Sequence, residues 1–169
     1  NHGPLFLDEI ANTSKRFQVK FLRVLQEKQV RRLGDLVDRQ LDVRVIAATN
    51  SDLRTMARSG DFREDLLYRL NVFSIEVPPL RKRLGDIPLL AGSIVETLNG
   101  QNTHVRTLSP EAQQKLQGYG YPGNVRELQN VVESAYYVAE GETIGAEHLN
   151  LPTDALVREP VEEIIVDDF

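Results

Sequence analysis

Two adjacent carboxylates, Asp8 and Glu9, follow a short apolar run at Leu5–Leu7. An uninterrupted apolar run is typical of a strand buried on both faces in a parallel sheet covered by helices. Ligands gather beyond the carboxyl ends of such strands, where one carboxylate can hold Mg²⁺ while the other orients or activates a water. Strands also end in acidic residues because the chain returns to solvent there, and the dipeptide alone favours this simpler explanation.

Thr49 and Asn50 follow a second apolar run, residues 43–48, in the same way. At the end of a neighbouring strand their side chains could reach a phosphate or a positioned water. A helix cap or an Asx turn before Asp52 explains the pair equally well.

Two arginines, Arg63 and Arg69, lie in a predicted helix over residues 61–70. The apolar stripe of this helix consists of Phe62, Leu66 and Leu70. Arg69 falls close to that stripe, where a cation is costly unless it is paired, so we expect it to have a specific partner. A salt bridge to Asp65 is the local alternative. The two arginines are not a whole number of helical turns apart, which predicts a broken helix or two different roles.

Arg126 lies in the first turn of another predicted helix, over residues 124–139. A helix N-terminus with free N–H groups and an arginine is suited to bind an anion. The alternative is a surface arginine paired with Glu127 or Glu133. The histidines His2, His104 and His148 are isolated and lack metal-ligand spacing, so we expect structural or surface roles for them.

Strands and helices alternate in the first part of the sequence, which predicts an α/β layer with parallel strands. The predicted strands are residues 5–7, 43–48 and 73–77, with a loop at residues 31–35. The intervening helices are residues 52–59, 61–70 and one carrying the apolar stripe Phe17, Phe21, Val24 and Leu25. Beyond Pro79 the pattern is helical throughout, with helices at residues 86–98, from Ser109 onward and at 124–139. We therefore predict a boundary near residues 80–85.

The overall composition is that of a soluble globular protein, with 41% hydrophobic and 27% charged residues. A net charge of -5 argues against a broad nucleic-acid-binding surface. The absence of cysteine excludes thiolate metal sites and cysteine nucleophiles. No apolar run predicts a membrane span or signal peptide, so a cytoplasmic location is expected. The sequence starts at Asn1 almost directly with a strand, which suggests that further sequence precedes it.

Six strings in this order resemble the sigma-54-dependent transcriptional activators, also called bacterial enhancer-binding proteins. The strings are LFLDEI (5–10), FLRVLQE (21–27), DVRVIAATN (42–50), FREDLLYRLNV (62–72), PPLRKR (78–83) and PGNVREL (122–128). The resemblance implies an α/β fold, an incomplete AAA+ parallel-sheet core followed by a small all-helical lid. Residues 1–82 would form the C-terminal part of the core and 83–152 the lid. Residues 153–169 would be an acidic, disordered tail.

The resemblance also implies roles for the candidate residues. Asp8 and Glu9 match the Walker B pair, with Asp8 on Mg²⁺ through water and Glu9 polarising the attacking water. Thr49 and Asn50 match the first sensor of the γ-phosphate, and Arg126 the second sensor on the lid. The two arginines of residues 62–72 match arginine fingers, which act on ATP held by the neighbouring subunit. The family forms rings, usually hexamers, that use ATP turnover to remodel the sigma-54 RNA polymerase holoenzyme.

Two family motifs are missing from these residues. No G-x-x-x-x-G-K-[ST] phosphate loop occurs, so we expect the chain alone to be inactive in ATP hydrolysis. The Gly-Ala-Phe-Thr-Gly-Ala-type loop that contacts the sigma factor is also absent, and both are expected upstream of Asn1. No helix-turn-helix follows the lid, so direct DNA binding is not expected.

Two further functions remain as alternatives. The chain could be a non-enzymatic interaction module that packs on or caps intact AAA+ subunits. Another AAA+ class, such as a helicase loader, would share Walker B and the fingers, but the LRVLQE and GNVREL strings disfavour it.

Overall fold

The computed structural model describes residues 2–31 and 37–152, so the predicted acidic tail lies outside the described residues. The chain consists of two compact units, and the boundary between them lies between Glu76 and Val77. We call the residues up to Glu76 unit 1 and those from Val77 unit 2; the sequence predicted a boundary near residues 80–85. Within the described ranges, no helix has both the length and the apolar character to cross a membrane.

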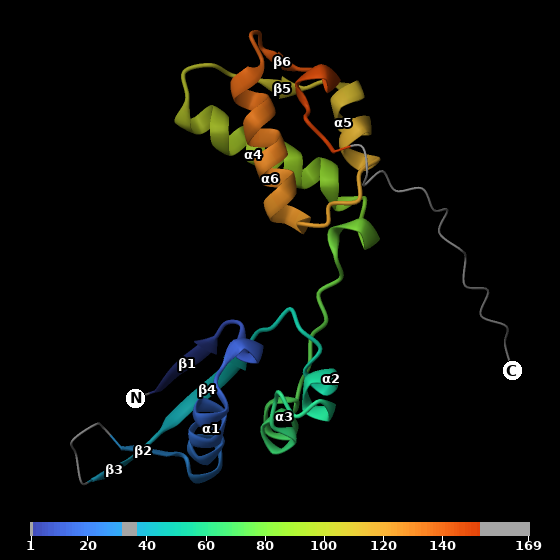
Figure 1. Cartoon of the computed structure of the whole chain (residues 1–169). Coiled ribbons are helices and arrows are strands. Elements are labelled where there is room, and N and C mark those ends of the chain that lie inside the picture. Colours follow the sequence, from blue (N-terminus) through green and yellow to red (C-terminus); the bar gives the residue numbers. More distant parts are fainter. Residues whose placement is uncertain (1, 32–36, 153–169) are drawn as a thin grey trace, which may run out of the picture. The chain divides into compact units, whose positions relative to one another are not determined.

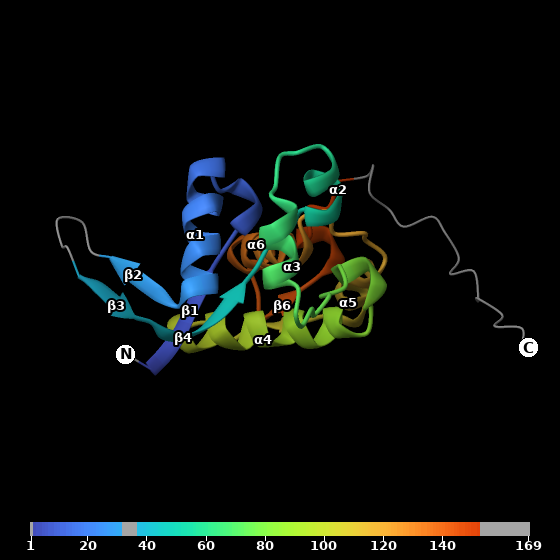
Figure 2. The ribbon, with the colours of Figure 1, turned by 90° about the horizontal axis from the view of Figure 1, so that it is seen from below.

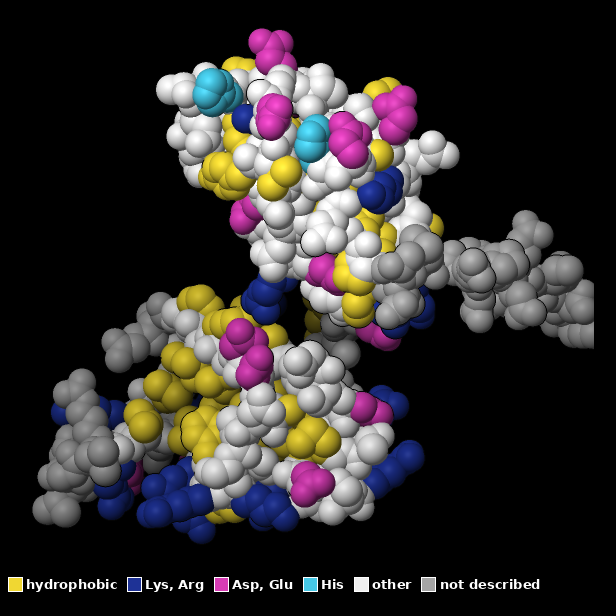
Figure 3. Space-filling model, turned by 45° about the horizontal axis from the view of Figure 1, so that its top comes forward, with side chains coloured by type: hydrophobic (Ala, Val, Ile, Leu, Met, Phe, Trp, Pro, Cys, Tyr) yellow, Lys and Arg dark blue, Asp and Glu magenta, His cyan; other side chains and the backbone are white. Residues whose placement is uncertain are grey.

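Unit 1 is built on two parallel strands, β1 (His2–Leu7) and β4 (Asp42–Ala47), which lie side by side in Figure 1. The register places Leu7 opposite Ala47 and Phe6 opposite Ile46. This pairing confirms the predicted parallel α/β layer. The expectation that β1 is buried on both faces is wrong, because Phe6 is 60% exposed and Ile46 is 44% exposed. Hydrophobic side chains accordingly gather on the surface of unit 1 in Figure 3.

Local signals explain where the helices of unit 1 begin and end. The elements are η1 (Ile10–Asn12), α1 (Lys15–Glu27), α2 (Leu53–Arg58) and α3 (Glu64–Leu70). Ser14 caps α1 by accepting the Phe17 N–H at 3.2 Å. Asp52 caps α2 by accepting the N–H groups of Arg54 and Thr55.

The buried face of α1 differs from the predicted stripe. Its buried residues are Gln18, Phe21 and Leu22, whereas Phe17 is 38% exposed. The buried face begins at Gln18 rather than at Phe17, so a polar side chain lies in the core.

Two further expectations for unit 1 are wrong. Residues 73–77 form no strand, and Phe73, Ile75 and Val77 are exposed. A strand needs a hydrogen-bonded neighbour, and no described strand pairs with this segment. In addition, Arg31 ends a strand rather than lying in a loop; the other residues of the predicted loop, 32–35, lie outside the described residues.

The strand ending at Arg31, β2 (Gln29–Arg31), pairs antiparallel with β3 (Asp38–Gln40). This hairpin projects from unit 1 in Figures 1 and 2. An ion pair between Arg31 and Asp38 joins its strands, with N···O distances of 2.8 Å. Strands of three largely polar residues carry too little periodicity to be found in the sequence.

Unit 2 packs three helices around one continuous core. The helices are α4 (Asp86–Gln101), α5 (Pro110–Gln117) and α6 (Asn124–Val138), with short turns η2 (Leu80–Lys82) and η3 (Ala146–His148). Ser109 caps α5 ahead of Pro110, as predicted. The lid is not entirely helical, because β5 (Thr107–Leu108) pairs in parallel with β6 (Thr143–Ile144).

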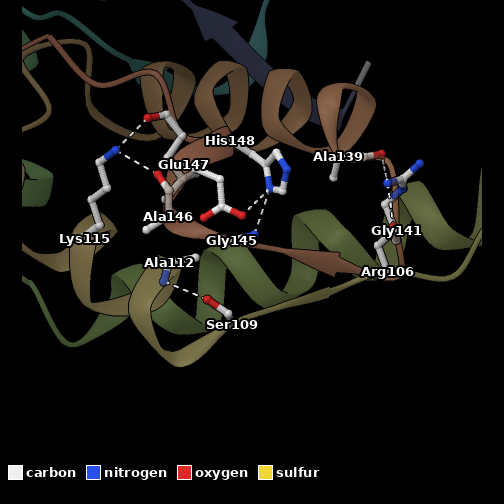
Figure 4. Close-up of polar contacts among 11 residues, drawn as sticks. Arg106, Ser109, Ala112, Lys115, Ala139, Gly141, Gly145, Ala146, Glu147 and His148 are labelled. Carbon is white, nitrogen blue, oxygen red and sulfur yellow. Dashed lines mark hydrogen bonds and ion pairs between the residues drawn. The ribbon is translucent and has the colours of Figure 1, made fainter.

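Polar side chains fasten the loops of unit 2 to its helices (Figure 4). Arg106 donates to the carbonyl oxygens of Ala139 and Gly141, and so ties the residue before β5 to the end of α6. Lys115 donates to the carbonyl oxygen of Ala146 at 2.8 Å, which holds η3 against α5. Such contacts satisfy carbonyl groups that a helix or turn leaves without a partner.

Candidate functional site

The parallel pairing of β1 with β4 brings Asp8–Glu9 and Thr49–Asn50 to the same sheet edge. The Ala48 N–H donates to the Leu7 carbonyl at 2.8 Å, and the Ile10 N–H donates to the Ala48 carbonyl at 3.1 Å. These two bonds continue the ladder past the last paired residues of the strands. The four polar residues are therefore neighbours at the carboxyl ends of adjacent strands, where ligands of α/β sheets bind.

Glu9 adopts a left-handed backbone conformation, with φ 48° and ψ 46°. This region is uncommon for residues other than glycine and occurs at functional sites when the surroundings enforce it. Here the Asp8 carboxylate accepts the Glu9 N–H at 2.9 Å, and the Glu9 carboxylate accepts the Asn12 side-chain amide at 2.9 Å. Both carboxylates remain exposed, so their other lone pairs face solvent.

Thr49 and Asn50 form the local turn that the sequence left open as an alternative. Thr49 Oγ1 accepts the Ser51 N–H at 3.1 Å, and Asn50 Oδ1 accepts the Ser51 hydroxyl at 3.2 Å. Both side chains are exposed beside Asp8 and Glu9. The turn therefore presents a hydroxyl and a carboxamide at the sheet edge, and these groups can still bond a ligand oxygen or a water.

The oxygen ligands at this edge suit a hard cation shared with a phosphate. Within residues 2–31 and 37–152, no three His, Asp or Glu side chains gather closely enough to hold a metal ion. Mg²⁺ commonly takes one or two carboxylates and completes its shell with water and substrate phosphates. Asp8 with Glu9 beside it fits that requirement.

Arg63 precedes α3 rather than lying inside it. Its backbone is extended, with φ -78° and ψ 129°, at the N-cap position. The helical spacing that the sequence suggested for the two arginines therefore does not apply. The guanidinium pairs with Asp65 through two hydrogen bonds of 2.9 and 2.6 Å, and this arginine holds the pKa of the Asp65 carboxyl below its usual range. The pair is exposed, which makes it an exchangeable surface contact.

Arg69 lies in the last turn of α3 and is exposed, which corrects its predicted position near the apolar stripe. That position was counted from Phe62, but the helix begins only at Glu64, so the spacing was not helical throughout. Its Nη2 donates to the Leu25 carbonyl at 3.3 Å. The local salt bridge considered for Arg69 is not formed, because Asp65 pairs with Arg63.

Arg126 is exposed in the first turn of α6 and has no hydrogen-bond or ion-pair partner among the described residues. Glu127 instead accepts the Gly123 N–H at 2.7 Å and the Tyr119 hydroxyl at 2.8 Å. Glu133 accepts the side-chain amide of Gln129. The acids that could have paired with Arg126 are thus occupied, and its guanidinium is available to an anion.

Sequence reasoning missed two residues that shape these sites. Gln18 is buried and bonds the backbone of Arg63. Its position at helical spacing with Phe21, Leu22 and Leu25 was the available signal, since a polar residue there must find partners. Gly123 is the second, because a Cβ there would lie 2.9 Å from the Glu127 Cβ.

Two family descriptions match the chain in succession. Residues 1–76 match the sigma-54 interaction domain, and residues 81–160 match the AAA+ ATPase lid domain. The chain is 47% identical over 150 residues to the response regulator PilR of Pseudomonas aeruginosa, covering 88% of this chain and 34% of PilR. It is 44% identical over 167 residues to the sigma54-dependent transcriptional regulator SfnR of Pseudomonas fluorescens, covering 98% of this chain and 46% of SfnR.

Solved structures give the same relationship. The crystal structure of NtrX from Brucella abortus superimposes with a TM-score of 0.82 at 36% identity, over 90% of this chain and 36% of NtrX. NtrX in complex with ATP superimposes with a TM-score of 0.81, over 96% of this chain and 38% of NtrX. The chain thus spans between about a third and about half the length of these relatives.

Proposed function

The chain belongs to the sigma-54-dependent transcriptional activators, with an α/β AAA+ core segment and a lid, and on this premise we propose that it is part of an ATP-hydrolysing module that remodels sigma-54 RNA polymerase. The observation that carries the proposal is the common sheet edge of Asp8–Glu9 and Thr49–Asn50. A nucleotide-dependent switch needs acids and a phosphate sensor on adjacent strands, and parallel pairing supplies that arrangement.

Each residue has a distinct role in this proposal. Asp8 holds Mg²⁺ through water, and Glu9 orients and polarises the attacking water. Thr49 and Asn50 bond the γ-phosphate or the water beside it. Bound Mg²⁺ supplies charge neutralisation at the phosphates. The left-handed backbone of Glu9 ends the extended path of β1 directly after Asp8, and Asn12 donates to the Glu9 carboxylate.

Arg63 and Arg69 act on ATP held by a neighbouring subunit of a ring, and Arg126 acts on nucleotide from the lid. Their exposure in the single chain supports these roles, since a group that works across an interface must be accessible before assembly. Within the 169 residues no G-x-x-x-x-G-K-[ST] loop is present to cradle the phosphates. We therefore expect no ATP turnover by this chain alone.

The test is complementation in trans. A module of this family that carries a G-x-x-x-x-G-K-[ST] loop is prepared with alanine at the two positions aligned with Arg63 and Arg69. Adding this chain should restore Mg²⁺-dependent ATP turnover, because an arginine supplied in trans is worth roughly 10³- to 10⁵-fold in rate. The Arg63→Ala variant should restore none, and Arg58→Ala, an exposed arginine of α2, is the matched control. No restoration by the unaltered chain would contradict the proposal.

The exposed apolar surface of unit 1 favours the second function, an interaction module that caps intact subunits. The same assay separates the two. A capping module should lower the ATP turnover of the unaltered loop-carrying module as the chain is added, and Arg63→Ala should leave that inhibition unchanged.

A further inference from the structure

Gln18 is a fully buried polar side chain, at 0% exposed, in the small core of unit 1. It occupies the face of α1 that also carries Phe21 and Leu22. Burying a carboxamide without partners costs free energy, and an apolar residue would pack there without that cost. A polar residue at such a position therefore points to a specific bonding task.

All the hydrogen bonds of the Gln18 side chain go to backbone groups. Its Nε2 donates to the Thr13 carbonyl at 3.0 Å and to the Asp61 carbonyl at 3.4 Å. Its Oε1 accepts the Arg63 N–H at 2.9 Å. One carboxamide thus joins the residues before α1 to the residues before α3, which are far apart in the sequence.

Gln18 holds the Arg63 N–H, while the Arg63 carbonyl accepts the Leu67 N–H at 3.0 Å as the first bond of α3. Arg63 stands at the N-cap of α3, where no side-chain cap bond is formed. Among the residues that the structure describes, its guanidinium pairs only with the exposed Asp65. The backbone of Arg63 is therefore anchored from the core by Gln18, while its side chain stays free to leave Asp65 for another anion.

The same carboxamide reaches the segment that follows the acidic pair. The Thr13 hydroxyl donates to the Ile10 carbonyl at 2.7 Å, and Asn12 bonds the Glu9 carboxylate. The residues after Glu9 and the residues before α3 are thereby bonded to one side chain.

We propose that Gln18 is a positioning residue for Arg63: its Oε1 holds the Arg63 peptide so that the guanidinium is presented from a fixed point on unit 1. This inference deepens the proposed function and rests on it for the role of Arg63 in trans. The bonding of the Arg63 peptide can be measured independently of that role.

Two substitutions separate positioning from a merely structural role. Gln18→Met removes the acceptor and both donors at similar volume. Gln18→Glu keeps the acceptor for the Arg63 N–H, but it replaces the Nε2 donor with an oxygen that faces the Thr13 and Asp61 carbonyls and places a carboxylate in the core. Stability should therefore fall further in Gln18→Glu than in Gln18→Met, because a buried charge costs more than lost hydrogen bonds. If Gln18 positions Arg63, the opposite order holds for the Arg63 amide and for complementation: Gln18→Met should change both more than Gln18→Glu does.

The measurements are thermal unfolding, hydrogen exchange of the Arg63 amide by NMR, and the trans complementation assay. Gln18→Met should speed exchange of the Arg63 amide about tenfold. It should also lower complementation about 10- to 100-fold, as expected when a catalytic group is misplaced by about 1 Å. Gln18→Glu should stay near the unaltered chain in both readouts, and Gln26→Met, on an exposed position of the same helix, should change nothing.

The inference is overturned if Gln18→Met leaves amide exchange and complementation unchanged. It is also overturned if, across the two Gln18 variants, amide exchange and complementation change in proportion to the loss of melting temperature. If Gln18→Glu is unfolded at neutral pH, the comparison is made at mildly acidic pH, where burial favours the neutral carboxyl group. If Arg63→Ala itself leaves complementation intact while Gln18→Met frees the Arg63 amide, the positioning stands and the proposed function fails.

Discussion

Unit 2 encloses its apolar residues, whereas unit 1 leaves many of them exposed. In the described part of the chain, the core of unit 2 contains sixteen buried residues and that of unit 1 only five. Three buried tyrosines and the helices α4, α5 and α6 close the core of unit 2. In unit 1, Phe6 and Ile46 on the sheet and Phe73 beyond α3 face solvent. Every candidate catalytic side chain also belongs to unit 1, the less self-contained of the two units.

This difference follows from how each unit satisfies its backbone. Helices bond their own N–H and C=O groups, so three short helices can close a core without outside partners. A pair of parallel strands has an open edge on each side and needs further strands or helices to cover its faces. We infer that unit 1 is the part of the molecule that depends on additional contacts, and the predictions below test that dependence.

Separating the units should give the largest effect. Residues 77–152 alone should unfold in one cooperative transition, because their core is complete. Residues 1–76 alone should self-associate and lack a sharp transition, since their exposed apolar faces and strand edges attract other chains. Circular dichroism melts at several concentrations, with light scattering, measure both. A sharp and concentration-independent melt of residues 1–76 would contradict the comparison, and the whole chain is the reference.

The helices of unit 2 were predicted more completely than the strands of unit 1. The reason is again that helices bond within themselves, whereas strands need a partner. The helices of unit 2 were found from their caps, as at Ser109 and Pro110, because capping chemistry is local. The strands β1 and β4 were also found, and with them the edge that gathers Asp8 and Thr49. The segment 73–77 has strand composition but no strand structure, since pairing depends on a neighbour that local sequence does not encode.

The candidate site was predictable in its residues but not in its contacts. The family resemblance implied the finger roles of Arg63 and Arg69, which stay predictions; from periodicity, Arg69 was expected near the apolar stripe, whereas it is exposed. The ion pair of Arg63 with Asp65 and the anchoring by Gln18 depend on where α3 begins. Helix boundaries are the least certain feature of a sequence-based prediction, and a shift of three residues changes which side chains meet.

A pair of glycine substitutions should sharpen the comparison within unit 2. Gly123→Ala would place a Cβ 2.9 Å from the Glu127 Cβ, and so displace the carboxylate that caps the start of α6. We expect a loss of about 1–3 kcal/mol in the free energy of unfolding. Gly92→Ala in α4 meets no atom within 4 Å, so it should raise that free energy by about 0.5–1 kcal/mol.

Urea unfolding of residues 77–152 and of the whole chain measures both changes. Because Gly123 and Gly92 are in the same unit, their opposite signs are independent of how unit 1 behaves. A neutral Gly123→Ala would mean that Glu127 moves freely and does not fix the turn before Arg126.

The stability of the two units should also respond differently to pH, with a smaller effect than that of the glycine substitutions. In unit 1, the pKa of Asp52 is lowered chiefly by the Thr55 hydroxyl, and that of Asp65 chiefly by Arg63. In unit 2, burial raises the pKa of Tyr119 and of Tyr121. A carboxyl with a lowered folded-state pKa stabilises the fold above its unfolded value, about 4, and loses that contribution as the pH falls. A phenol with a raised folded-state pKa contributes below its unfolded value, about 10, and loses that contribution as the pH rises.

Unit 1, with these two carboxyls against Glu111 alone in the described part of unit 2, should therefore weaken first in acid. Unit 2 should weaken first in alkali, and Tyr119 and Tyr121 should ionise only as it unfolds. Tyrosinate absorbance and helical circular dichroism, followed together on residues 77–152, check the alkaline limb. If Tyr119 and Tyr121 ionised while the helices stayed intact, their phenols would not be held as buried donors, and the closed core assigned to unit 2 would have to be revised.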